Sequence, residues 1–299
     1  MAELVITGTI GLDDIETPFG KVTSALGGTG AYAAVAASFF TKPSLVSIVG
    51  KDLPSAHLDL LRERGIDIEG VAQAKKTFRW KGFYEFDMNE AKTLKTELNA
   101  LSEFNPKLPE SYTNAKFLFL ANTDPKVQLK TLKQMKSRPF TLIDSMNFWI
   151  QNNKAGLLKV IKKSHMVVLN EGEARQLFRD PNLIKAGRRL INLGPEFAVI
   201  KKGEHGALLF SEHGFFSAPG YPLEELKDPT GCGDSFSGAM IGYIAKSGDL
   251  SERNIRKAVI YGSIVASYCA ESFSLEYIKE TKLKDIKERY GVFRKIRRF

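Results

Sequence analysis

The spacing of apolar residues along the chain switches repeatedly between two patterns from residue 115 onward. Short apolar runs rich in β-branched and aromatic residues alternate with longer stretches in which apolar residues recur every three or four positions. The first pattern predicts buried strands, at 116–121, 140–144, 165–169, 197–201 and 207–211. The second predicts amphipathic helices, at 125–136, 153–162, 171–178 and 182–193. Such alternation predicts a parallel sheet with helices on both faces.

The first hundred residues add strands and helices to this sheet and interrupt it with a different pattern. Apolar runs predict strands at 3–10, 45–49 and 66–72 and helices at 27–37 and 54–64. Residues 15–26 contain Pro18 and Gly20 and predict a hairpin or flap, and residues 77–98 alternate with a period of two and are rich in aromatic residues. The pattern at 77–98 predicts a small antiparallel sheet, and we expect one domain over 1–299 with a small β-sheet lid formed by about 12–26 and 74–100.

The C-terminal part predicts three helices, 233–246, 251–270 and 275–289, and the first follows a turn rich in glycine. This turn runs from Asp228 to Asp234 in the sequence DPTGCGD. The first amides of a helix have no intrahelical partner, and small residues let an anion approach them closely. A carboxylate at this position would repel a bound anion, but it could accept a proton from a hydroxyl that attacks a phosphate. The alternative is an ordinary helix cap, in which Asp234 has no chemical role.

Composition and charge narrow the classes of protein to which the chain could belong. The chain has 299 residues, 43% of them hydrophobic, and a net charge of +9. The two cysteines, Cys232 and Cys269, are too few for a disulfide framework, which predicts a reducing, cytoplasmic location. No signal peptide and no apolar run of ~18 residues is apparent. A basic tail at 294–299 is accompanied by no nucleic-acid-binding motif, so neither a nucleic acid nor a membrane is predicted as a partner.

Polar residues follow each of the predicted strands of the second half. Ligands bind to parallel sheets at the carboxyl ends of the strands, so these residues predict a site there. Any one of them could instead be a helix cap, and Asp124 and Asn170 are good candidates for that role. The set comprises Asn122, Asp124, Asp144, Asn147, Asn170, Glu173 and 202–206.

A glycine-rich segment near the N-terminus permits a different function. Residues 28–33 read GTGAYA, which fits the GxGxxA fingerprint of dinucleotide-binding proteins, and Asp52 follows at the end of the next predicted strand. Some 16 residues separate this segment from the first strand, whereas the fingerprint normally follows the strand directly. A nicotinamide-dependent oxidoreductase therefore stays a remote alternative.

The turn at 228–234 resembles the anion-hole and catalytic-base motif of the ribokinase-like (PfkB) carbohydrate kinases, D-T/P-x-G-A-G-D. Cys232 stands where that family usually has alanine. Asn170 and Glu173 resemble the family's N-x-x-E motif, and Gly203 and Gly206 match its nucleotide-binding glycine loop. The resemblance covers nearly the whole chain and implies a ribokinase-like fold, a large doubly wound α/β sheet with a small β lid.

The resemblance also implies roles for particular residues. Asp234 would be the base, and the amides of Gly231, Cys232 and Gly233 would stabilise the transferred phosphoryl group. Mg²⁺ would be handled by Glu173, largely through water, and a monovalent cation such as K⁺ would lie near Asp228 and Thr230. ATP would bind at Asn170, Lys202, Gly203 and Gly206. The acceptor would contact Asp13, Gly28, Thr29, Tyr32, Asn122 and Asn147.

The activity implied is transfer of the γ-phosphate of ATP to a hydroxyl of a sugar or related small polyol, with a nucleoside as the alternative acceptor. An inactive scaffold of the same fold is a remote alternative. Tyr32 stands where the family usually has an asparagine that contacts the sugar, and its ring could stack on a bulkier acceptor. Equally, Tyr32 could pack into the core while Asn122 or Asn147 contacts the hydroxyls. The family also implies that the lid could mediate a homodimer.

Overall fold

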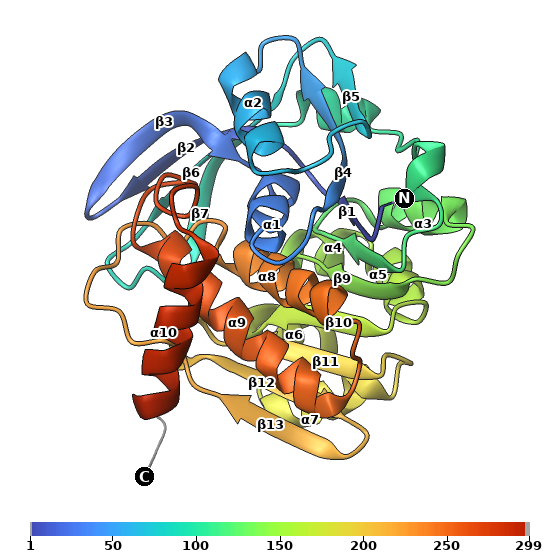
Figure 1. Cartoon of the computed structure of the whole chain (residues 1–299), viewed down its shortest axis with the longest axis vertical. Helices are drawn as coiled ribbons and strands as arrows, with labels where there is room; N and C mark the ends of the chain where they lie inside the picture. The colour runs from blue at the N-terminus through green and yellow to red at the C-terminus, as the bar shows by residue number, and fades with distance from the viewer. Residues whose placement is uncertain (1, 297–299) are drawn as a thin grey trace.

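The computed structural model describes residues 2–296, so the last residues of the basic tail, 297–299, lie outside the described part. Its main element is a nine-stranded sheet in the order β13-β12-β11-β10-β9-β8-β1-β4-β5 (Figure 1). All neighbours are parallel except β11, β12 and β13, which pair antiparallel at one edge. The strands are β1 (Leu4–Thr7), β4 (Ser44–Gly50), β5 (Val71–Ala74), β8 (Phe117–Leu120), β9 (Phe140–Asp144), β10 (Met166–Asn170), β11 (Phe197–Lys201), β12 (Ala207–Ser211) and β13 (Gly214–Ala218).

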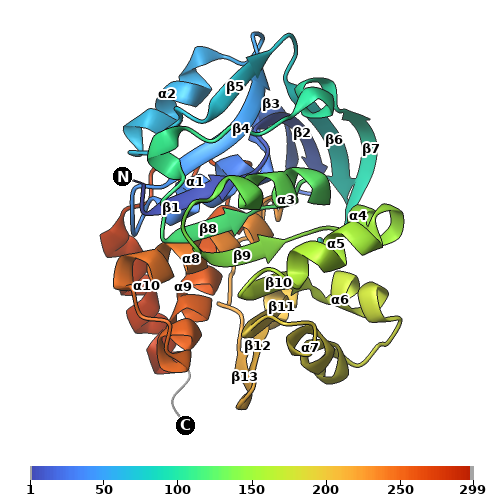
Figure 2. The ribbon, with the colours of Figure 1, turned by 90° about the vertical axis from the view of Figure 1, so that its right-hand side faces the viewer.

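Helices cover both faces of this sheet, because successive side chains of each strand point to opposite faces (Figures 1 and 2). Leu4 and Ile6 of β1 join one buried cluster, and Val5 joins the other. The first cluster includes residues of α1 (Thr29–Ala37), α2 (Ser55–Glu63), α8 (Cys232–Ser247), α9 (Glu252–Ala270) and α10 (Leu283–Ile296). The second includes residues of α3 (Pro125–Gln134), α4 (Asn147–Asn152), α5 (Lys154–Ile161), α6 (Glu171–Phe178) and α7 (Leu183–Ile191). The doubly wound α/β fold is thus confirmed.

A second sheet of four strands lies beside the large one, in the order β3-β2-β6-β7 (Figure 1). The strands are β2 (Gly11–Thr17), β3 (Gly20–Gly27), β6 (Phe78–Tyr84) and β7 (Ala91–Glu97). The antiparallel sheet expected over 77–98 is present as the pair β6 and β7, and the hairpin of β2 and β3 joins it through a parallel pairing of β2 with β6. The first strands of the two hairpins, β2–β3 and β6–β7, therefore run in the same direction. No described helix is long and apolar enough to cross a membrane.

Several predicted boundaries differ from the structure. The last helix begins at Leu283 rather than 275, because residues 274–280 form turns; Ser274 there has a left-handed backbone (φ 55°), and its amide donates to Asp228 Oδ2 at 3.1 Å. Of the predicted strand 66–72, only Val71 and the next residues pair with β4, apart from an isolated bridge at Asp67. The sequence patterns missed β13 and α4, as well as short 3₁₀ turns at Asn99–Glu103, Glu110–Tyr112 and Gly203–His205.

Candidate active site

The turn before α8 exposes unpaired backbone amides at the carboxyl end of the sheet. Gly231 caps the helix in a left-handed conformation (φ 76°), and a Cβ there would lie 2.4 Å from the ring of Tyr32. Within the described residues no acceptor is bonded to the amides of Gly231 and Gly233, whereas the amide of Cys232 donates to the carbonyl of Pro229 at 3.2 Å. Two of the three amides expected to bind phosphate are therefore free in this conformation, and the third is engaged in the turn.

Asp234 lies in the first turn of α8 and is half-buried. Across the part of the chain that the structure describes, no donor is bonded to its carboxylate, so this group is free to accept a hydrogen bond from a ligand. Behind it, Lys201 Nζ lies 3.0 Å from Asp144 Oδ2 and 3.4 Å from the carbonyl of Gly233. The hydroxyl of Ser237 donates to the same Asp144 oxygen at 3.1 Å. The base is thus backed by a buried ion pair that ties three elements together.

The buried charges around Asp234 change its acidity. Burial and the neighbouring Asp144 raise the pKa of Asp234 to about 7, while Lys201 lowers it. Burial alone would lower the pKa of Lys201, but the carboxylates of Asp144, Glu173 and Asp234 outweigh it and raise that pKa. A carboxyl with a pKa near neutrality can both accept and release a proton, as a general base must.

Asp13 lies on β2 and is 4% exposed. Its carboxylate packs directly on Gly27, where a Cβ would lie 1.9 Å from Oδ2. Burial, together with Asp228 and Asp234, raises the pKa of Asp13 to about 8, and the amide of Gly28 opposes that rise. The expected acceptor ligand and the expected base are therefore coupled electrostatically.

Other residues expected to contact the acceptor form a connected group. The side-chain hydroxyl of Thr29 donates to the carbonyl of Asn122 at 3.2 Å, and Trp149 Nε1 donates to Asn122 Oδ1 at 3.1 Å. Trp149 also packs edge-on against Phe148, which is 49% exposed. Asn147 is exposed at the start of α4 and makes none of these contacts. An aromatic surface thus continues outward from Asn122, and the sequence patterns did not predict it.

Tyr32 does not offer the stacking face that its position suggested. Its side chain is 1% exposed, lies against Gly231 and belongs to the large buried cluster on the α1 face. The expectation that its ring stacks on an acceptor is therefore wrong for this conformation, because packing beneath the turn occupies the ring. The alternative, in which Tyr32 belongs to the core, describes the structure.

The predicted nucleotide-binding residues lie at the ends of β10 and β11. Asn170 and Glu173 form a capping box: Glu173 accepts from the amide and the side-chain amide of Asn170 at 2.8 and 2.7 Å. Lys202 donates its amide to the carbonyl of Gly206 at 2.7 Å and closes the glycine loop. Gly206 has φ 83°, and a Cβ there would lie 2.1 Å from the carbonyl of Ala218, so only glycine fits. The loop is therefore shaped by its backbone.

The residues expected near a monovalent cation also stabilise the turn itself. Asp228 is fully buried and accepts the amides of Thr230 at 2.8 Å and of Ser274 at 3.1 Å. The hydroxyl of Thr230 donates to the hydroxyl of Tyr84 on lid strand β6 at 3.2 Å. These contacts join the lid, the turn and the segment before α10. The K⁺ site stays a prediction.

The charges of the site bear on how it could bind Mg²⁺. Asp144, Glu173 and Asp234 share a single cation, Lys201, and burial together with Asp144 raises the pKa of Glu173 to about 8. The described residues contain no group of three or more acidic, histidine or cysteine side chains arranged to hold a metal. This deficit of positive charge fits a Mg²⁺ ion that phosphate oxygens and water hold, because Mg²⁺ needs few protein ligands.

The residues that fit the dinucleotide-binding fingerprint make other contacts in the structure. Asp52 accepts the amide and the hydroxyl of Thr77 at 2.7 and 2.8 Å and lies 3.7 Å from Arg79. A Cβ on Gly30 would lie 2.9 Å from the backbone of Gly8, so this glycine allows α1 to approach the end of β1. The segment 28–33 therefore packs α1 onto the sheet, and Asp52 anchors the lid.

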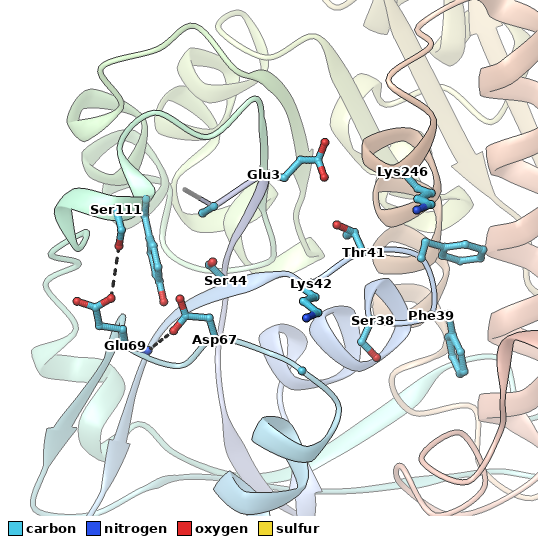
Figure 3. Close-up of a pocket in the computed structure, with 14 residues that line it drawn as sticks. Glu3, Ser38, Phe39, Thr41, Lys42, Ser44, Asp67, Glu69, Ser111 and Lys246 are labelled. Carbon is cyan, nitrogen blue, oxygen red and sulfur yellow. Dashed lines mark hydrogen bonds between the residues drawn. The ribbon is translucent and has the colours of Figure 1, made fainter.

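A polar cavity of about 780 Å³ lies at the opposite end of the strands from the candidate active site, where β1 and β4 begin (Figure 3). Glu3, Lys42, Asp67 and Lys246 are among its lining residues, and none of the predicted site residues is. It is therefore separate from the candidate active site.

The chain is similar in sequence and in fold to proteins that are already known. The chain matches the model of the pfkB family of carbohydrate kinases over residues 11–282. It is 29% identical over 259 residues to a cytidine kinase of Thermococcus kodakarensis, covering 84% of this chain and 92% of that protein. The nucleoside kinase structure of Methanocaldococcus jannaschii has a TM-score of 0.78 at 20% identity, with 97% and 98% of the chains covered. A putative ribokinase II from E. coli, solved with ATP and Mg²⁺, has a TM-score of 0.81 at 17% identity, covering 98% of this chain and 100% of that one.

Two contributors to the site were missed at the level of sequence. The sequence patterns give Lys201 no role of its own, although a cation at the carboxyl end of a strand beside the glycine loop is a usable signal. Ser237 follows Asp234 by three positions, which places both on one side of α8. Lys202, the residue expected to bind ATP, makes two backbone hydrogen bonds within the loop, to the carbonyl of Gly206 and from the amide of His205.

Proposed function

Because the chain belongs to the pfkB family of carbohydrate kinases, we propose that it transfers the γ-phosphate of ATP to a hydroxyl of a nucleoside. The observation that carries the proposal is the position of Asp234. Its unpaired carboxylate lies in the first turn of α8, in the same turn as the free amides of Gly231 and Gly233, and is coupled electrostatically to Asp13. A base, donors for phosphate and a ligand for a hydroxyl are the parts that phosphoryl transfer to an alcohol needs.

The proposed reaction needs one proton acceptor and one set of phosphate donors. As the oxygen of the acceptor hydroxyl forms a bond to the γ-phosphorus, Asp234 takes the proton of that hydroxyl. The bond between that phosphorus and the β,γ-bridging oxygen breaks, and its electron pair leaves with ADP. The amides of Gly231 and Gly233, with the positive end of α8, stabilise the charge on the transferred group. Asp13 accepts hydrogen bonds from the acceptor and orients it.

ATP is proposed to lie along the ends of β10 and β11, against the loop from Lys202 to Gly206. Mg²⁺, when bound, offsets the charge of the phosphates, and Glu173 would hold it through water. Asn170 orients the Glu173 carboxylate through the capping box. Gly203 and Gly206 let the backbone of the loop approach the nucleotide.

Two observations favour a nucleoside over a simple sugar. Relatives and structural neighbours include proteins named cytidine kinase and nucleoside kinase. Beside Asn122, the exposed ring of Phe148 and the edge of Trp149 form an apolar surface on which a nucleobase can stack, worth roughly 1–3 kcal/mol per base. A free sugar has no flat ring to use this surface.

A sugar kinase is the second candidate, favoured by the family itself and by partial similarity to fructokinases. The fructokinase-2 of Oryza sativa is 26% identical over 119 residues, 39% of this chain. The buried carboxylate of Asp13 would suit either acceptor, since both present hydroxyls. Dimerisation through the lid also stays a prediction.

An acceptor screen tests the proposal. Purified protein with ATP and Mg²⁺ is assayed for ADP release with cytidine, uridine, adenosine, inosine, ribose, fructose and inositol, and products are identified by mass spectrometry. We expect a nucleoside to be phosphorylated with the highest kcat/KM. Preference for ribose or fructose would make the protein a sugar kinase, and no ADP release with any acceptor would contradict phosphoryl transfer to this group of compounds.

A further inference from the structure

The ion pair behind Asp234 is unusual in its burial and in its contacts. The side chains of Lys201 and Asp144 are 16% and 4% exposed. Lys201 lies at the end of β11 and Asp144 at the end of β9, while Gly233 lies in the first turn of α8, so the pair joins two strands of the sheet to the helix that carries Asp234. A buried ion pair carries a large desolvation cost and is weak evidence for a role in stability alone.

Lys201 touches the phosphate-binding turn directly. Its ammonium lies 3.4 Å from the carbonyl of Gly233, and a Cβ on Gly233 would lie 2.9 Å from Nζ. The absence of a side chain at Gly233 thus leaves room for the ammonium. Asp144 is held in place by three further contacts, with Ser237 Oγ at 3.1 Å, the amide of Ser145 at 2.8 Å and, through its carbonyl, Gln128 Nε2 at 3.0 Å.

We propose that Lys201 is a positioning residue that fixes the first turn of α8 together with Asp144 and, through its own ammonium, favours the charged, proton-accepting form of Asp234. This inference rests on the function proposed above and adds to it a residue that acts through the base. The two members of the pair act on Asp234 in opposite directions: the ammonium favours the carboxylate, and Asp144 disfavours it.

Other titratable groups near Asp234 come from several elements. Glu173 on α6 and Asp13 on β2 also interact with Asp234, as does the thiol of Cys232 in the same turn. Among these groups Lys201 is the only cation. Its removal therefore leaves only negative or neutral groups next to the base, and we expect Asp234 to hold its proton to a higher pH.

The test compares Lys201→Met, Asp144→Asn and the double variant with the wild type. The pH dependence of kcat is measured from pH 5.5 to 9 with ATP, Mg²⁺ and the acceptor found in the screen. We expect Lys201→Met to move the acidic limb to higher pH and to lower kcat at pH 7 at least about tenfold, with KM for ATP changed less than about threefold. Asp144→Asn should move the limb to lower pH, and the double variant should return toward the wild type. Lys159→Met, on the exposed side of α5, is the control and should leave the limb unmoved.

A merely structural pair would lower activity in both single variants without moving their limbs in opposite directions. Shifts of the same sign, or no shift, would overturn the proposal. The titration of Asp234, followed by carbon-13 NMR of labelled aspartate and assigned with Asp234→Asn, gives a readout that needs no acceptor. If the wild type phosphorylates nothing in the screen, the proposed function fails, while opposite NMR shifts would still support the coupling of Lys201 and Asp144 to Asp234. If Lys201→Met does not fold, circular dichroism shows it, and the direction in which the limb moves in Asp144→Asn still decides whether the pair acts on Asp234.

Discussion

The phosphate side of the site, residues 228–234 with Lys201 and Asp144, differs in construction from the acceptor side around Asp13 and Asn122. On the phosphate side one continuous turn supplies both the free amides and Asp234, and a buried ion pair supports it from behind. On the acceptor side, contacts come from β2, α1, the end of β8 and α4, which lie far apart in the sequence. The comparison indicates that the phosphate side sets whether phosphoryl transfer occurs, and the acceptor side sets which molecule receives it.

The largest effect is expected on the phosphate side. Asp234→Asn keeps the shape of the side chain but cannot accept the proton, so kcat should fall by at least ~10²-fold with every acceptor. The fold and ATP binding should be kept, as measured by circular dichroism and calorimetric titration. Asp249→Asn, just beyond the other end of α8, serves as the control. Near wild-type turnover in Asp234→Asn would remove this residue from the chemistry.

On the acceptor side, Asp13→Asn should weaken acceptor use more than ATP use. At pH 9, above the pKa of about 8 at which Asp13 ionises, losing this charged hydrogen-bond acceptor costs about 1.5–3 kcal/mol, so kcat/KM for the acceptor should fall roughly 10–100-fold, with KM for ATP little changed. Asp14→Asn, at the neighbouring position on β2, is the matched control. Equal changes for ATP and acceptor would show that Asp13 does not belong to the acceptor side.

The same substitution should change stability with pH. Because the pKa of Asp13 is raised to about 8, the folded state binds this proton more tightly than the unfolded state, which has the ordinary value. The stabilising effect of the protonated carboxyl is present at low pH and is lost as pH rises through about 8. Asp13→Asn should therefore unfold at a higher temperature than the wild type at pH 9, with a smaller difference at pH 6. An equal difference at both pH values would contradict the raised pKa.

A smaller and more selective effect is expected at the exposed aromatic surface. Phe148→Ala should raise KM for a nucleoside about fivefold, corresponding to a loss of about 1 kcal/mol of base stacking, and should leave KM for ribose unchanged. Phe215→Ala, which removes a similarly exposed ring from β13 at the far edge of the sheet, is the control. Equal effects on nucleoside and ribose would show that Phe148 contacts no nucleobase.

The two sides also differ in how far the sequence predicted them. The order of strands and helices and the turn at 228–234 followed from local patterns, because period, glycines and helix starts are encoded by neighbouring residues. The role of Tyr32 did not follow, because its burial depends on Gly231, some 200 positions away in the chain. The Lys201–Asp144 pair and the contact of Trp149 with Asn122 likewise join distant segments. The parallel pairing of β2 with β6 could not be read from an alternating pattern, which is the same for either direction.

The central claim, that Asp234 accepts the proton of the acceptor, is tested most directly by the pH dependence of kcat/KM. Asp234 must be ionised to act as a base, and its pKa is raised to about 7. We expect kcat/KM for the acceptor to rise with a slope of one as pH increases toward about 7 and then to level off, in the wild type and also in Asp13→Asn. A rate that is independent of pH between 5.5 and 8.5 would contradict the assignment of Asp234 as the base.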